Sequence, residues 1–407
     1  MNDDLVRWTL QVAAVAVLAP ISGHAERARE SLAPRAGEAS VTRVYVGTYA
    51  SGGGRGIYRL DFDRSTGRWA SEPTLAAGST NPSFLALHPS GRFLYAVNEL
   101  QDFQGKPTGA LSAFAVDGST GRLTLLNEQA SEGLDPCHLV ADASGRNVLV
   151  ANYTSGTVAV LPVSADGRLQ RASAVRRVIG SGPVRGRQEG PHAHHITIDA
   201  SGRFALWADL GSDRVRVDRF DGTAGRLEPN DPDGVAIEAG SGPRHLAWHA
   251  SGRVLYVLNE LSSTVSALRF DATRGVLAVF QTVSARASGA SGVNDSAEIA
   301  VAPDGRFLYA SNRGDDDIAV FAIDEATSGL TPVGHVSTGG RTPRSFAIDP
   351  SGRWLIAANQ RSNSLVVFRL DPATGLPSAV GAPITIPEPV CVLFAPPSPQ
   401  GAEMPAQ

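Results

Sequence analysis

Residues that can transfer protons or bind anions recur beside short apolar segments along this chain. The segment PHAHH supplies His192 and His194, GPRH supplies Arg244, NEL supplies Glu260 and SNRG supplies Arg313. Imidazoles and carboxylates exchange protons, and guanidinium groups bind carboxylates or phosphates through paired hydrogen bonds. These residues therefore predict acid–base chemistry on a small anionic or carbonyl-bearing molecule.

A second group of polar side chains holds comparable places and is expected to contact the substrate. Some members also have a plainer explanation: an Asn at a strand end can cap a turn, and a Glu can pair with Arg244 or Arg313. The two histidines of PHAHH lack a third ligand at fixed spacing, so neither a metal nor another cofactor is expected. The second group comprises His138, Asn152, Tyr153, Asp209, Glu298 and Arg344.

These residues belong to a repeated unit. A Ser/Asp-Gly-Arg turn recurs at intervals of 54, 57, 50, 53 and 47 residues. Self-similarity at such a period indicates a repeat architecture. The turns are centred on Gly91, Gly145, Gly202, Gly252, Gly305 and Gly352.

Each unit contains four apolar segments of about five residues bounded by Gly, Pro and Asp, which is the pattern of strands joined by hairpins. Four antiparallel strands repeated around a ring form a β-propeller. VYVGTY, from Val44, resembles the second strand of a unit that lacks its first, and PVCVLFAP, from Pro389, resembles a first strand. We therefore predict an all-β, seven-bladed propeller whose N- and C-terminal strands pair and close the ring.

Hairpin geometry predicts where the polar residues meet. The start of each first strand and the end of each second strand lie at one edge of the blade, and the turn lies at the other. Because first strands are innermost in a propeller, both groups should converge at one mouth of the central channel. Strand alternation places His192 and His194 on the same face. Cys137 and Cys391 fall on different blades, so no disulfide is expected.

The N-terminal segment of the chain suggests an exported protein. An apolar segment ends near Ala25, which predicts a signal peptide over residues 1–25, followed by a linker over 26–40. The propeller is expected over 41–396 and an unstructured tail over 397–407. The net charge of -4 argues against nucleic acid as a partner, and no other segment could span a membrane. We expect a periplasmic or secreted monomer, with a cytoplasmic location as the alternative.

The chain resembles the seven-bladed propeller lactonase family, whose members include the propeller-type 6-phosphogluconolactonase and the fungal carboxy-muconate cyclase. The resemblance covers nearly all of the expected propeller and rests on PHAH, GPRH, NEL, SAEI and SNRG together. It implies a metal-independent site in the channel mouth. Its acid–base residues would be His192 or His194, Arg244, Glu260 and Arg313.

The leading hypothesis is a lactonase that hydrolyses a sugar lactone. Glu260 would activate water, Arg244 and Arg313 would bind the carbonyl or a carboxylate, and His194 or His192 would donate a proton. One alternative is an isomerase that closes a muconate-type diacid into a lactone with the same residues. Another is a non-catalytic exported propeller that binds a ligand or a protein.

Overall fold

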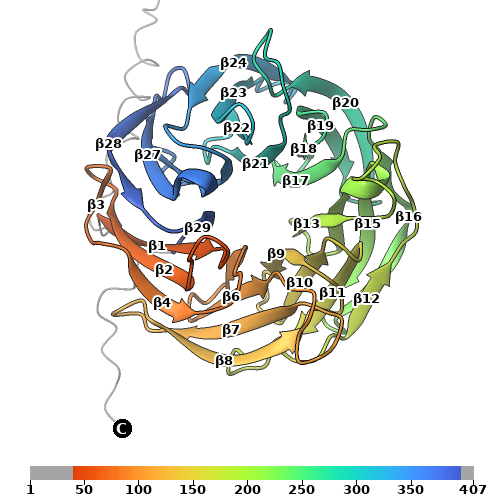
Figure 1. Cartoon of the computed structure of the whole chain (residues 1–407). Coiled ribbons are helices and arrows are strands. Elements are labelled where there is room, and N and C mark those ends of the chain that lie inside the picture. Colours follow the sequence, from red (N-terminus) through yellow and green to blue (C-terminus); the bar gives the residue numbers. More distant parts are fainter. Residues whose placement is uncertain (1–39, 396–407) are drawn as a thin grey trace, which may run out of the picture. The chain divides into compact units, whose positions relative to one another are not determined.

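Short segments rich in Val, Leu, Ile and aromatic residues form the strands of seven antiparallel sheets. A computed structural model describes residues 40–395. The sheets are arranged as blades around a common centre (Figure 1). The predicted signal peptide and tail, and the linker up to residue 39, lie outside the described residues. Within residues 40–395, no helix has the length and apolar content needed to cross a bilayer.

The strands take equivalent places in every blade. The innermost are, in blade order, β29 (Pro389–Phe394), β5 (Leu85–Leu87), β9 (Pro136–Ala141), β13 (Ala193–Ile198), β17 (Pro243–Trp248), β21 (Ser296–Val301) and β25 (Pro343–Ile348). The second strands are β1 (Val41–Thr48), β6 (Phe93–Asn98), β10 (Asn147–Asn152), β14 (Phe204–Asp209), β18 (Val254–Asn259), β22 (Phe307–Asn312) and β26 (Trp354–Asn359).

The third and outer strands complete the blades, with two 3₁₀ turns following β14 and β26. The third strands are β2 (Gly56–Asp63), β7 (Ala110–Val116), β11 (Thr157–Pro162), β15 (Arg214–Asp221), β19 (Thr264–Asp271), β23 (Asp317–Ile323) and β27 (Ser364–Leu370). The outer strands are β3 (Arg68–Trp69), β4 (Thr74–Gly78), β8 (Leu123–Ala130), β12 (Ala174–Arg177), β16 (Arg226–Ala236), β20 (Val276–Ser284), β24 (Leu330–Ser337) and β28 (Pro377–Thr385). The 3₁₀ turns are η2 (Leu210–Ser212) and η3 (Gln360–Ser362).

The two ends of the described chain close the ring, as predicted. Strand β29 pairs antiparallel with β1, and Val392 lies opposite Val46 (Figure 1). The Thr42 hydroxyl donates to the carbonyl of Ala395 at 2.8 Å. The first blade therefore combines the last strand with the first two, and its outer position is shared by β3 and β4, which both pair with β2. Closure leaves no unpaired inner edge that could recruit another chain.

Aromatic residues of the second strands join neighbouring blades. The Tyr45 hydroxyl donates to the carbonyl of Gly121 at 3.0 Å, in the outer turn of the next blade. The same contact recurs around the ring, because a buried phenol needs an acceptor. The other three are Tyr95 to Gly167, Tyr256 to Ser328 and Tyr309 to Gly375.

Both cysteines lie where the repeat predicted. Cys391 is on the first blade and Cys137 on the third, and both are buried free thiols. The six Ser/Asp-Gly-Arg turns lie at the edge of the blades opposite the polar residues. Their glycines all have φ between 65° and 74°, a conformation that residues with a Cβ adopt at a cost. The repeated Gly is therefore a requirement of the turn.

Candidate active site

A β-bulge at the start of the innermost strand brings an extra side chain to the channel in most blades. In β17, Pro243 pairs with Asn259 and His245 with Leu258, so Arg244 is left without a partner in the ladder. Such bulges re-aim side chains and are frequent beside active sites. Equivalent register shifts set apart Val390, Cys137, His194, Glu298 and Arg344 in the other blades.

The side chains displaced by these bulges line one small cavity at the channel axis. Its volume is about 10 Å³, roughly the space that one water molecule requires. Every blade contributes to its wall, and most of the lining side chains are polar. The lining residues are Ser83, Phe84, Cys137, His194, Arg244, His245, Glu298, Arg344 and Val390.

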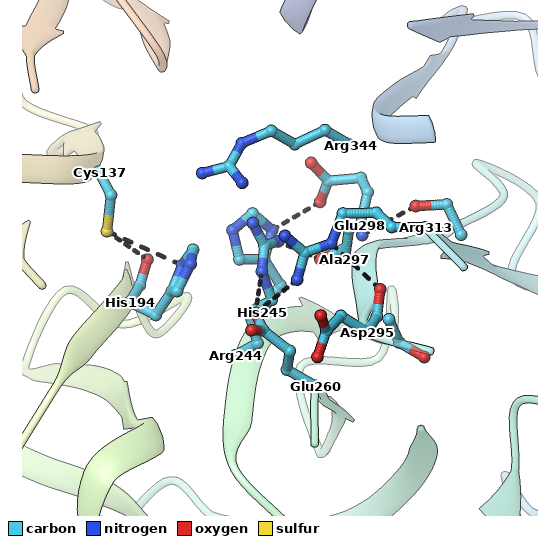
Figure 2. Close-up of polar contacts among 12 residues, drawn as sticks. Cys137, His194, Arg244, His245, Glu260, Asp295, Ala297, Glu298, Arg313 and Arg344 are labelled. Atoms are coloured by element: carbon cyan, nitrogen blue, oxygen red, sulfur yellow. Dashed lines mark hydrogen bonds and ion pairs between the residues drawn. The ribbon is translucent and has the colours of Figure 1, made fainter. Parts of the chain in front are cut away.

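Three arginines surround Glu260 at the mouth. Its Oε2 lies 2.8 Å from Nε of Arg244 and 3.0 Å from Nη2 of Arg313 (Figure 2). Its Oε1 accepts a hydrogen bond from Arg187. Burial of this carboxylate alone would raise its pKa. The guanidinium groups, above all that of Arg313, outweigh burial and lower the pKa of Glu260 to about 2. Glu260 therefore stays ionised at neutral pH and is a weak base.

Arg187 lies in the loop between β12 and β13 and was not among the residues predicted from the sequence. Its guanidinium also lies 3.5 Å from Asp295, so this loop reaches from the fourth blade to the fifth and sixth. The buried Gln188 anchors it by donating to the carbonyl of Leu210 and to Asp213, both at 2.8 Å. The loop is therefore a fixed part of the mouth.

Arg344 differs from the other three arginines of the mouth. Among residues 40–395, no carboxylate forms an ion pair with it. It donates to the hydroxyl of Tyr49 at 2.9 Å, and that hydroxyl donates to Glu99 at 2.7 Å. Its positive charge is therefore compensated only indirectly, through the hydroxyl of Tyr49 and the carboxylate of Glu99.

A second carboxylate, Glu298, has surroundings opposite to those of Glu260. Its Oε1 lies 2.8 Å from Nδ1 of His245, and its Oε2 lies 3.5 Å from the Ser345 hydroxyl. Burial raises the pKa of Glu298 to about 7, with Arg244 as the largest opposing influence. Figure 2 shows Glu298 and His245 between Arg344 and the Glu260 cluster.

The two histidines of PHAHH that were predicted to share a face have different surroundings. His192 lies on the rim, where its ring stacks on Tyr153 at 4.5 Å and its Nδ1 donates to the Tyr153 carbonyl. His194 is buried, and its Nδ1 lies 3.8 Å from Sγ of Cys137. The bulge at Ala193–His195 interrupts the alternation, so the unpredicted His195 also turns inward and contacts His245 at 4.9 Å.

Burial holds the pKa of these inner histidines well below the ordinary value, so they are neutral at pH 7. His138 belongs to the same layer: its ring stacks on His195 at 3.7 Å, and burial likewise lowers its pKa. It packs against aromatic rings in the channel wall, including that of Phe84 at 4.0 Å. Within residues 40–395, no three His, Cys, Asp or Glu side chains are placed to hold a metal ion.

Two residues predicted to contact substrate are instead bonded within the fold. Asn152 is fully buried and donates to the carbonyl of Ser131 and to Thr157, the plainer explanation noted for strand-end asparagines. Asp209 is also fully buried, caps η2 and pairs with Arg216 at 3.2 Å. Neither side chain reaches the mouth, because each satisfies backbone and side-chain donors at a strand end.

Tyr49 and Glu99 show what signal could have extended the sequence prediction. Both directly follow the end of a second strand, as Glu260 and Arg313 do. Counting one residue past every second strand would have found them. His195 offers no such signal, since a bulge cannot be recognised from alternation.

Comparison with known proteins agrees with the seven-bladed fold described above. Residues 43–394 match the model of the family described as "Lactonase, 7-bladed beta-propeller". A 6-phosphogluconolactonase of Bacillus subtilis is 38% identical over 86% of this chain and 97% of its own. One from Formosa agariphila is 36% identical over 74% of this chain and 85% of its own. The solved periplasmic gluconolactonase of Pseudomonas aeruginosa has a TM-score of 0.82 at 34% identity, covering 88% of this chain and 99% of that one.

Proposed function

The chain belongs to the seven-bladed β-propeller lactonase family, and we propose that it is a hydrolase that opens a sugar lactone at the mouth of its channel. The relatives named as 6-phosphogluconolactonases and as a gluconolactonase support the substrate class. The single structural observation that carries the proposal is the guanidinium of Arg344, which forms no direct ion pair among residues 40–395 and lines a water-sized cavity. Lactone hydrolysis needs a bound water next to a group that stabilises negative charge on the carbonyl oxygen.

Arg344 is the donor to the lactone carbonyl. As water attacks, charge accumulates on that oxygen, and a pre-positioned cation stabilises the transition state more than the substrate. Arg244, Arg313 and Arg187 cannot do this equally well, because Glu260 already compensates part of their charge.

Glu260 has a role other than the general base expected from the sequence. A carboxylate with a pKa of about 2 takes up a proton from water poorly. It holds three guanidinium groups at fixed positions, where they make the wall of the mouth positive toward a polyhydroxylated or anionic substrate. His194, which is neutral and lines the cavity, remains the proposed hydrogen-bond donor to the ring oxygen.

The test is proton release by the purified chain with glucono-δ-lactone and with its 6-phosphate, after subtraction of spontaneous hydrolysis. Arg344→Met is expected to lower kcat/KM by about 10²–10³-fold, the usual effect of losing one such donor. Arg253→Met is the matched control, because Arg253 is exposed at the opposite edge of a blade. Absence of turnover by the folded wild type with both lactones would contradict the proposal and favour the binding propeller.

We also propose that the chain is exported and is a monomer. The apolar N-terminal segment and the periplasmic relative support export, with cleavage after Ala25. Recovery of the full-length chain from the cytoplasmic fraction of the native cell would contradict export. Sedimentation of the purified chain as a dimer would contradict the monomer.

A further inference from the structure

We propose that Glu298, paired with His245, is the general base of this site and takes the proton from the attacking water. The proposal rests on the lactone hydrolysis proposed above. It places proton transfer in the cavity that Glu298 and Arg344 both line, and not at Glu260. The sequence analysis assigned the base to Glu260, which directly follows a second strand, whereas Glu298 lies near the start of an innermost strand.

The position of Glu298 is the first argument. It enters the channel from β21 through a bulge, and both it and His245 line the water-sized cavity, whereas Glu260 does not. The Glu298 side chain is 12% exposed and that of Glu260 is 5% exposed. Figure 2 shows Glu298 and Arg344 on the same side of the His245 ring. A water molecule in the cavity would therefore meet both the base and the cation that stabilises the oxyanion.

The hydrogen bonds of Glu298 keep one oxygen available. Oε1 is held by Nδ1 of His245 at 2.8 Å and by the backbone N–H of Ile299 at 3.1 Å. Among residues 40–395, Oε2 has only the Ser345 hydroxyl as a hydrogen-bond partner, at 3.5 Å. A base must keep a lone pair free for the proton it accepts, and Oε2 does so. Both oxygens of Glu260, in contrast, are occupied by guanidinium groups.

The charged and titratable groups around Glu298 come from four other innermost strands. Burial raises its pKa to about 7, against the opposing influence of Arg244. A base is most effective when its pKa lies near the working pH. The surrounding groups are Arg244 and His245 from β17, His195 from β13, Arg344 from β25 and Cys391 from β29.

The reaction balances with these residues alone. Glu298 accepts one proton from water as the water oxygen bonds to the carbonyl carbon, and the carbonyl π electrons move to an oxygen held by Arg344. The intermediate then collapses, the ring C–O bond breaks, and the leaving alkoxide takes up the proton from Glu298. The products are the open-chain hydroxy acid, which ionises and releases one proton, and the regenerated carboxylate.

The pH dependence of kcat/KM of the wild type provides the first test. This test does not depend on whether a variant folds. Because the base must be unprotonated, kcat/KM should fall tenfold per unit as pH drops below about 7. If Glu260 were the base, activity would stay level down to far lower pH, since its pKa is about 2. A level profile from about pH 4.5 to pH 8 in an active enzyme would overturn the inference and leave the proposed lactonase intact.

Variants provide the second test. Glu298→Gln keeps the shape of the side chain and is expected to lower kcat by about 10²–10⁴-fold, with little change in KM and no acidic limb in the residual rate. Glu298→Asp should restore part of the rate and the limb. Glu325→Gln is the control, because Glu325 is exposed on an outer turn. Full activity of Glu298→Gln, with the acidic limb unchanged, would overturn the inference.

Discussion

Two glutamates at one channel mouth have opposite electrostatic surroundings. Glu260 faces three guanidinium groups, which outweigh burial and keep it ionised. Glu298 is also buried but has a neutral histidine as its nearest partner, so burial dominates and raises its pKa to about 7. Residue type alone could not assign their roles, because a carboxylate is an anchor or a base according to its neighbours.

Replacing Glu260 by Gln should destabilise the fold and not only slow the reaction. Removing the shared partner leaves buried guanidinium groups uncompensated, which typically costs about 3–5 kcal/mol. The folded pKa lies below the unfolded one, so this stabilisation is complete above about pH 4.5 and is lost as pH falls toward about 2. Urea unfolding of wild type and variant at several pH values measures the difference.

The matched control for that measurement is Asp304→Asn. Asp304 forms an exposed ion pair with Arg306 at 3.9 Å, and such pairs contribute at most about 1 kcal/mol. If Glu260→Gln were no more destabilising than Asp304→Asn at neutral pH, Glu260 could not be the anchor of the arginines.

At the level of elements, the two edges of a blade differ. One edge carries the Ser/Asp-Gly-Arg turn, and the other carries the polar residues of the candidate site. The Ser/Asp-Gly-Arg turn is interchangeable among blades, since it needs only a residue that tolerates positive φ. The bulge at the other edge sets apart one or two residues of the innermost strand, and their identity differs from blade to blade. The repeat therefore keeps the strands and turns alike in all blades, while the residues at the mouth of the channel differ from blade to blade.

The glycine turns offer a matched pair of substitutions. Gly145 and Gly202 both have φ of 71°, so replacement by Ala costs each about 1–2 kcal/mol of conformational energy. A Cβ at Gly145 would lie 2.1 Å from Nε2 of His88 in the preceding blade, whereas one at Gly202 would meet nothing within 4 Å.

Gly145→Ala should therefore be more destabilising than Gly202→Ala, because it also displaces the His88 ring, whose Nε2 lies 3.0 Å from the Gly145 carbonyl oxygen. Chemical denaturation of the two variants compares them directly. Equal losses of stability would mean that the contact between blades contributes nothing beyond the turn itself.

For the whole molecule, the site depends on a closed ring. All seven blades contribute to the wall of the cavity, including Val390 from the strand that closes the ring. No blade holds a complete site, since Arg344, His245 and Glu298 come from three different blades.

A chain that ends at Glu388 lacks β29 and should lose both stability and activity. It would expose the edge of β1, and unpaired inner edges promote association between chains. Light scattering and thermal unfolding measure the effect, and a chain ending at Ala395, which retains β29, is the control. A monomeric, fully active truncated chain would show that closure by β29 is dispensable.

The blades, their number, the closure of the ring and the edge at which polar residues gather could all be predicted from the sequence. These features depend on local patterns, namely strand periodicity, turn glycines and a repeat. Each pattern can be recognised within the residues of a single repeat unit or by comparing the units. Arg244, Glu260 and Arg313 were found in the same way and lie together at the mouth.

Only the tertiary structure decided which of the predicted residues lack a direct ion pair, which are held by ion pairs or hydrogen bonds, and which are moved out of the regular strand alternation by a bulge. Bulges turn His194 and His195 inward together, Arg187 reaches Glu260 from a distant loop, and Asp209 is fully buried by local bonds. The physical reason is that pKa values and ion pairing depend on burial and on neighbours from other blades. Those neighbours are set by the closed ring, whereas strands and turns are set by residues close in sequence.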